Sequence, residues 1–234
     1  MKRIVIIAGS GEARALARAL PEALVVLPEA ERVARSWDNA LLRGPLTAAD
    51  LHAWGAVAVV EAAHPCDAGT AFAAARASAN AGVPHLQLVR PGWRAGHRDR
   101  WVPLRRASDA VRVIPRGARV LVTTGREVLP ELRALRAEVL MRRIGNDCAP
   151  LPLWRGRMIC GAGPFTVADE IRLLRRERID WLMVHDAGGP GGWPKLAAAR
   201  ALQLPVALVA RPRRPGGPRV ATVKEALAWL ETQR

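Results

Sequence analysis

The sequence lacks any long apolar run. Its uncharged stretches fall well short of the roughly 20 residues that a membrane-spanning helix needs, which excludes a transmembrane protein. The opening residues imitate a signal peptide only faintly, because Glu12 and Arg14 follow the short apolar core at once, and we expect a first β-strand there. Half of the residues are hydrophobic and the mean hydropathy is +0.03, so a soluble globular protein is expected.

Cysteine is also scarce. Cys66, Cys148 and Cys160 are odd in number, and no two of them form a CxxC pair. This pattern indicates free thiols in a reducing cytosol rather than a metal site. We therefore expect three free thiols, no bound metal and a cytoplasmic location.

Acidic residues are outnumbered and lysine is nearly absent. Against 36 Lys and Arg stand 21 Asp and Glu, which gives a net charge of +15, and only Lys2, Lys195 and Lys224 are lysines. Such an excess attracts polyanions: nucleic acid, an anionic membrane, or a small substrate with many carboxylates or phosphates. Guanidinium groups pair bidentately with carboxylate and phosphate. A nucleic-acid-binding protein is one alternative, although no helix-turn-helix, zinc finger or RNP motif is present.

The two halves of the chain resemble each other. Three landmarks of the first half recur 121 residues later: His64, Pro84 and Arg90-Pro91 return as His185, Pro205 and Arg211-Pro212. A repeat of this length is too long for a solenoid unit and indicates a duplicated domain. Two domains of one design place a cleft between them, where small-molecule sites tend to lie.

Along the sequence, short apolar runs alternate with helical patterns. The runs themselves show no period-two alternation, which is typical of parallel strands covered on both faces. The expected strands are 4–8, 24–27, 57–60, 85–89, 119–123, 138–143, 181–184 and 206–210. The expected helices include 12–20, 47–54, one beginning at Asp67 or Thr70, 108–114, 127–136, 166–177, 195–202 and 223–232. The predicted fold class is α/β, with two small Rossmann-like, doubly wound parallel-sheet domains from an internal duplication. We expect domains 1–114 and 115–234, with the boundary near Pro115.

Ligands of such folds bind beyond the carboxyl ends of the strands. Gly9-Ser10-Gly11-Glu12-Ala13-Arg14 follows the first strand and opens a helix, where glycines let the backbone approach a pyrophosphate and the helix presents free N–H groups. Arg43, with Arg32 and Arg35, favours a 2′-phosphate and hence NADPH. The alternatives are an ordinary strand–helix turn, or a site for S-adenosylmethionine with Glu29 or Glu31 as the ribose anchor.

Four further segments follow expected strands. His64 is placed to hydrogen-bond a substrate or donate a proton, or else to hold its own loop together. Trp93 lies among arginines, a combination that suits a planar anion or an exposed interdomain loop. Thr124-Gly125-Arg126 offers a hydroxyl, amides and a guanidinium to an anion, unless Thr124 merely caps a helix. Gly188, Gly189 and Gly191 indicate close backbone approach to a ligand or a mobile lid, and Lys195 begins the next helix within reach of an anion.

Taken in order, these motifs resemble the precorrin-6A reductase family of cobalamin biosynthesis. The resemblance covers nearly the whole chain and rests on Gly9–Arg14, His64-Pro65, Arg90-Pro91 with Trp93, Thr124–Arg126, Gly163-Pro164-Phe165 with Glu170, the Gly188–Lys195 loop, Pro205 and Arg211-Pro212. The chain departs from the family pattern at Gly11, Glu61, Ala63, Cys66 and His185.

The resemblance implies an NADPH-dependent oxidoreductase that reduces precorrin-6A to precorrin-6B by hydride transfer and protonation of a neighbouring ring carbon. The polycarboxylate ring agrees with the excess of arginine. The implied roles are as follows: Gly9, Ser10, Gly11, Glu12, Arg14 and Arg43 bind NADPH; Trp93, Thr124, Gly125, Arg126, Gly188, Gly189 and Gly191 bind the tetrapyrrole; His64 and Lys195 are the candidate catalytic residues, with bulk water as the alternative source of the proton. A methyltransferase acting on tetrapyrroles is the second alternative, and a hand-over of product to the next pathway enzyme stays open.

Overall fold

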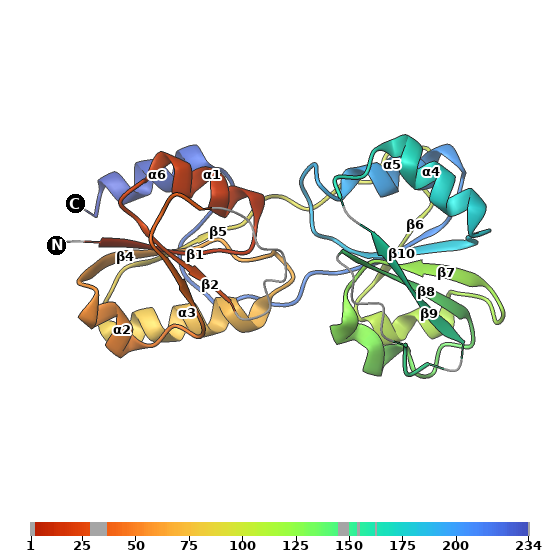
Figure 1. The fold of residues 1–234 in the computed structure, drawn as a ribbon, viewed down its shortest axis with the longest axis horizontal. Coiled ribbons are helices and arrows are strands. Elements are labelled where there is room, and N and C mark those ends of the chain that lie inside the picture. Colours follow the sequence, from red (N-terminus) through yellow and green to blue (C-terminus); the bar gives the residue numbers. More distant parts are fainter. Residues whose placement is uncertain (1–2, 29–36, 145–149, 154, 162, 234) are drawn as a thin grey trace. The chain divides into compact units, whose positions relative to one another are not determined.

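The computed structural model describes residues 3–28, 37–144, 150–153, 155–161 and 163–233. The chain forms two compact units (Figure 1). Unit 1 consists of residues 1–91 and 212–234, and unit 2 consists of residues 92–211. Each unit contains one six-stranded sheet in which all paired strands are parallel.

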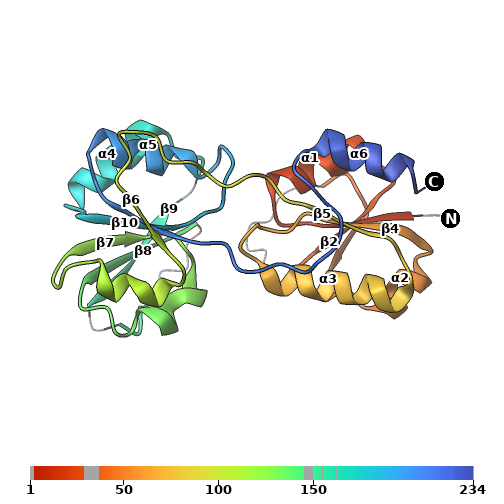
Figure 2. The ribbon, with the colours of Figure 1, turned by 180° about the vertical axis from the view of Figure 1, so that it is seen from behind.

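The sheet of unit 1 has the strand order β12-β5-β4-β1-β2-β3. Its elements are β1 (Arg3–Ile7), α1 (Gly11–Ala19), β2 (Leu24–Leu27), β3 (Leu41–Arg43), α2 (Ala48–Ala53), β4 (Ala56–Glu61), α3 (Ala68–Ala81), β5 (His85–Leu88), β12 (Arg219–Val220) and α6 (Val223–Glu231). Helices α1 and α6 cover one face and α2 and α3 the other (Figures 1 and 2). If β12 is counted as a sixth strand, this is the 3-2-1-4-5-6 order of a Rossmann-like fold.

The sheet of unit 2 has the corresponding order β6-β11-β10-β7-β8-β9. Its elements are β6 (Trp101–Leu104), the 3₁₀ helix η1 (Ala107–Arg112), β7 (Arg119–Val122), the 3₁₀ helix η2 (Arg126–Leu132), β8 (Glu138–Ile144), β9 (Gly156–Gly161), α4 (Val167–Arg176), β10 (Trp181–His185), α5 (Trp193–Ala201) and β11 (Val206–Val209). The matching orders are what a duplicated domain predicts, and the expected fold class is confirmed.

Each central strand buries both of its faces, which explains why the strands read as continuous apolar runs. In β1, Ile6 packs against α1 and α6, whereas Val5 and Ile7 pack against α2 and α3. The sheet of unit 2 is covered in the same way, with α4 and α5 over one core and η1 and η2 over the other.

The sixth strand of each sheet comes from the other half of the sequence. After β5 the chain leaves unit 1 and adds β6 to the edge of unit 2, beside β11. After β11 it returns and adds β12 beside β5. The structure therefore divides the chain at 91/92 and 211/212 and not near Pro115, because β12 and α6 complete the sheet and core of unit 1.

Several local predictions need correction. Strands β3, β6, β9 and β12 were not expected, and the segments expected as helices at 108–114 and 127–136 are the shorter 3₁₀ helices η1 and η2, the second of which contains Pro130. The prediction of three free thiols is wrong for Cys160 in β9, which is disulfide-bonded. Cys66 is not disulfide-bonded, and Cys148 lies outside the described residues.

Candidate active site at the carboxyl ends of the strands

In unit 1, the glycine turn directly follows β1 and opens α1. Ser10 is the N-cap of α1, and its side-chain oxygen accepts a hydrogen bond of 3.1 Å from the Ala13 N–H. A Cβ at Gly9 would lie 3.0 Å from the backbone nitrogen of His64 and 3.1 Å from the Cα of Ala63, whereas a Cβ at Gly11 would meet nothing within 4 Å. Gly9 is therefore required by packing between two loops of the protein, and Gly11 leaves open space in front of the helix.

We expect Gly9→Ala to lower the free energy of unfolding by about 1–3 kcal/mol, because the added methyl group would push against backbone that has no free rotamer. Gly11→Ala is the matched control and should leave stability within about 0.5 kcal/mol of wild type. Urea denaturation of the two variants measures both values. Equal stability of the two variants would contradict the assigned role of Gly9.

Two charged side chains of α1 already have partners inside unit 1. Glu12 accepts a hydrogen bond of 2.6 Å from Arg90, and both side chains are largely buried. The pKa of Glu12 is lowered, because its hydrogen bonds and the charge of Arg90 outweigh the opposing effect of burial. The guanidinium of Arg14 stacks over the indole of Trp37, 4.5 Å from the ring centroid. Arg43 ends β3 at the same edge of the sheet and is exposed.

His64 lies in the loop after β4, and a buried ion pair anchors this loop. The His64 Nδ1 accepts a hydrogen bond of 3.3 Å from the Cys66 N–H. Glu61, at the end of β4, is completely buried and pairs with Arg214, which is 4 % exposed. Arg214 also donates to the Pro65 carbonyl at 3.3 Å. Burial raises the pKa of Glu61, although Arg214 acts against this rise.

In unit 2, Thr124-Gly125-Arg126 follows β7. The N-cap of η2 is Gly125, with a φ of +100° and no side-chain capping bond, so the structure does not give Thr124 the capping role considered above. Thr124 is 6 % exposed, and among the described residues its hydroxyl has no hydrogen-bond partner. A buried hydroxyl without a hydrogen-bond partner, at the edge of the sheet where ligands bind, is a candidate contact for a bound group.

The glycine loop after β10 is tightly held. Gly188 and Gly189 have φ angles of +66° and +71°, in the left-handed region that favours glycine. The Trp93 indole N–H donates to the Gly189 carbonyl at 2.9 Å, and its ring packs so closely on Gly192 that a Cβ there would lie 2.6 Å from a ring carbon. Trp93 therefore holds this loop, and Gly191 borders open space.

Lys195 lies in the first turn of α5, and its ammonium group donates to the Gly192 carbonyl at 3.3 Å. Burial, together with the nearby charge of Arg142, lowers the pKa of Lys195 to about 8, and Glu170 opposes this effect. Arg142 and Glu170 form a bidentate ion pair with both distances at 2.8 Å, 6 % and 1 % exposed. Phe165 packs against Arg142.

Every predicted site residue thus lies at the carboxyl edge of one of the two sheets. The sequence reasoning missed Arg142, Arg214 and the role of Glu61. The sequence contains no signal of a buried role for Arg142, because an arginine within an apolar strand is ordinarily interpreted as a side chain that reaches solvent. Arg214 had a signal in the sequence: it lies 121 residues after Trp93, and each of the two follows the arginine of an Arg-Pro pair of the repeat by three positions.

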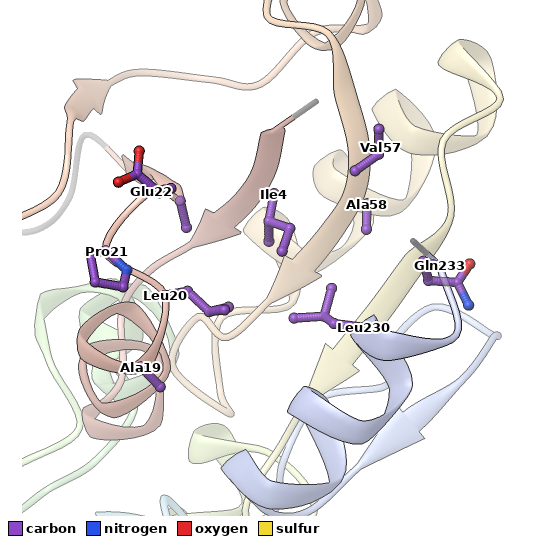
Figure 3. Close-up of a pocket in the computed structure, with 10 residues that line it drawn as sticks. Ile4, Ala19, Leu20, Pro21, Glu22, Val57, Ala58, Leu230 and Gln233 are labelled. Atoms are coloured by element: carbon purple, nitrogen blue, oxygen red, sulfur yellow. The ribbon is translucent and has the colours of Figure 1, made fainter. Parts of the chain in front are cut away.

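A pocket of about 500 Å³ lies at the opposite, amino end of the unit 1 sheet (Figure 3). Ile4, Val57 and Leu230 contribute to its apolar wall, and among the residues that the structure describes Glu22 is the one charged residue in the lining. Parallel α/β sheets bind ligands at the carboxyl ends of their strands. This pocket is therefore not the candidate site, and none of its described lining residues offers a cation to a carboxylate or phosphate.

Comparison with known proteins agrees with this arrangement. Residues 3–231 match the family model described as precorrin-6x reductase CbiJ/CobK. The chain belongs to this family. Two curated relatives named precorrin-6A reductase, from Rhodococcus erythropolis and Mycobacterium tuberculosis, are each 34% identical over 247 aligned residues, which cover 99% and 98% of this chain and 98% of each relative. A relative of the same name from Rhodobacter capsulatus is 36% identical over 74% of this chain and 69% of its own length.

The solved structure of a CobK precorrin-6A reductase superposes with a TM-score of 0.90 at 31% sequence identity, and the match covers 100% of this chain and 97% of that one. The resemblance drawn from the sequence motifs is confirmed. The described part of the chain contains no helix long and apolar enough to cross a membrane. Within the same residues, no three metal-ligating side chains form a cluster that could hold an ion.

Proposed function

We propose that this protein reduces precorrin-6A to precorrin-6B with NADPH in cobalamin biosynthesis. Its family consists of precorrin-6x reductases, and the observation that carries the cofactor proposal is the open Gly11 turn at the N-terminus of α1. When bound there, a reduced nicotinamide supplies a hydride to one ring carbon, and a proton adds at the neighbouring carbon.

The carboxyl edge of unit 1 fits a dinucleotide. The first-turn N–H groups of α1 and the space beside Gly11 suit a pyrophosphate, since a helix N-terminus favours anions. Gly9, Ser10 and Glu12 shape the turn, Arg14 lies one turn further along α1, and Arg43 is the cation for a 2′-phosphate.

The carboxyl edge of unit 2 fits a polycarboxylate. Unit 2 contains 22 Lys and Arg against 11 Asp and Glu, whereas unit 1 contains 14 against 10, so most of the excess positive charge lies in unit 2. In the proposal, Thr124, Gly125 and Arg126 bind substrate carboxylates. The loop containing Gly188, Gly189 and Gly191 lies against the ring, with Trp93 behind the loop.

Lys195 is the proposed proton donor. A general acid is most effective when its pKa lies near the working pH, and burial brings the pKa of Lys195 to about 8. His64, whose Nδ1 is engaged by the Cys66 N–H, orients a reactant through its ring and is the second candidate for proton transfer.

The test is anaerobic turnover of precorrin-6A, followed by the loss of NADPH absorbance and a product heavier by two hydrogens. We expect Arg43→Gln to raise the KM for NADPH about tenfold and to leave the KM for NADH unchanged, because a lost charged hydrogen bond to phosphate is worth about 1.5 kcal/mol. Arg18→Gln removes an exposed charge at the far end of α1 and is the control. Equal use of NADH and NADPH by the wild type would refute the role of Arg43.

A further inference from the structure

The chain passes between the two units twice, and each passage starts at an Arg-Pro pair. The unit boundaries fall between Pro91 and Gly92 and between Arg211 and Pro212. Arg90 and Arg211, the arginines of the two pairs, are 15% and 20% exposed. Both follow the last residue of the strand that precedes the passage by only two positions.

Each of these arginines contacts an acidic residue beside a glycine-containing turn at the carboxyl edge of the sheet in its own unit. Arg90 binds the carboxylate of Glu12, next to the turn Gly9–Gly11. Arg211 donates from its Nε to the Asp186 carbonyl at 2.7 Å, with the Asp186 carboxylate at 3.6 Å, and Asp186 opens the glycine loop of unit 2. The two arginines correspond in the repeat, but their partners do not, because Glu12 follows β1 and Asp186 follows β10, the counterpart of β4.

The segment that follows each unit boundary is also held by hydrogen bonds. Trp93 donates its backbone N–H to Asp186 at 2.9 Å and its indole N–H to the Gly189 carbonyl. Arg214 pairs with Glu61 and donates to the Pro65 carbonyl, beside His64. Asp186 thus receives hydrogen bonds from both passages, and a Cβ on Gly92 would lie 2.2 Å from its carboxylate.

We propose that Arg90 and Arg211 are positioning residues. Arg90 holds the Gly9–Gly11 turn in place for the cofactor, and Arg211 holds the glycine loop after β10 in place for the substrate. Neither needs to touch a reacting atom for this role. The inference rests on the proposed function, in which unit 1 binds NADPH and unit 2 binds the tetrapyrrole.

The experiment compares Arg90→Gln with Arg211→Gln, and measures the KM for each reactant, kcat and the thermal midpoint. Arg90→Gln should raise the KM for NADPH about tenfold and change the KM for precorrin-6A less than twofold, and Arg211→Gln should do the reverse. Arg94→Gln and Arg213→Gln remove exposed charges next to the same passages and should leave both KM values unchanged. If both variants raise both KM values alike, if neither raises either, or if the controls behave in the same way, the inference is wrong.

A double-mutant cycle separates positioning from direct binding. Asp186→Asn keeps an acceptor for the Trp93 N–H and removes the charge that faces Arg211. If Arg211 acts through Asp186, the effects of the two substitutions on the KM for precorrin-6A will not add. Additive effects would show that Arg211 does not act through the Asp186 carboxylate and would overturn the proposal for it.

Direct titration followed by NADPH fluorescence measures the affinity for NADPH without turnover, so it tests the role of Arg90 even if precorrin-6A is not reduced. A wild type that binds NADPH but leaves precorrin-6A unreduced refutes the proposed function, while weaker binding by Arg90→Gln still supports the role of Arg90. Arg90→Lys retains a cation for Glu12 and should recover most of the lost affinity. Failure of this recovery, with a thermal midpoint like that of wild type, would contradict the ion-pair mechanism.

Discussion

Replacing Arg214 with alanine is expected to lower the free energy of unfolding by about 3–5 kcal/mol, because the substitution leaves a buried carboxylate without its partner. Glu61 is completely buried at the end of β4, and Arg214 is its charged partner. The same side chain donates to Gln87 and to the Pro65 carbonyl. Chemical denaturation at pH 7.5 measures the loss, and the neighbouring exposed Arg213→Ala should change stability by less than about 0.5 kcal/mol.

The deficit of Arg214→Ala should also depend on pH. Without Arg214, the pKa of Glu61 in the folded protein rises further above its ordinary value of 4.5. The folded state then binds the proton more tightly than the unfolded state, so the deficit is small near pH 4.5 and grows as the pH rises through the folded pKa. In Glu61→Leu/Arg214→Met both charges are gone, and this variant should recover much of the stability. A loss no larger than that of Arg213→Ala would show that the pair contributes little.

The parts of the fold that sequence predicts well are those set by neighbouring residues. β2 lies where its apolar run indicates, and α3 is capped by Asp67, one of the two expected starts of this helix. Thr47 and Asp50 form the capping box that begins α2. Burial on both faces leaves a continuous apolar run, and a cap leaves a polar residue three positions before its partner, so both signals lie within a short window.

The exchange of edge strands has no such local signal. β12 has only two residues, and β6 contains Pro103, so neither shows an apolar period. Whether such a segment pairs with its own half or with the other is decided by which sheet has an open edge, which is a property of the whole fold. The same limit applies to the ion pairs, since Glu61 and Arg214 are 153 residues apart and Glu12 and Arg90 are 78 apart.

The sequence repeat predicts the correspondence of the two halves only approximately. Gln87 pairs with Glu61, and its counterpart Leu208, 121 residues later, pairs with Val184. His185 therefore corresponds in sheet register to Ala62, two residues before His64. The histidines match in sequence but not in position, because the loops after β4 and β10 differ while the strands agree. The edge of the sheet could be predicted, but the individual role of each loop residue could not.

Lys195→Met is expected to reduce kcat about 10²–10⁴-fold, the range that a positioned general acid contributes. Its ammonium group donates to the Gly192 carbonyl at the start of α5. The charged groups around it are Arg142 of β8, which lowers its pKa, and Glu170 of α4, which raises it. Loss of the ammonium group should not unfold the protein, since desolvation of the buried charge opposes folding. An unchanged thermal midpoint would exclude a folding defect as the cause.

The pH profile of the wild type tests the same role. A proton donor must be protonated, and the pKa of Lys195 is about 8, so kcat/KM should be level below that pH and fall about tenfold per unit above it. Lys195→Arg keeps the positive charge at every accessible pH but holds its proton too tightly to donate it. If Lys195 donates the proton, this variant will bind precorrin-6A with normal affinity and turn over as slowly as Lys195→Met. Nearly normal turnover by Lys195→Arg, with the alkaline limb gone, would instead make Lys195 an anchor for a substrate carboxylate and leave proton transfer to His64 or water.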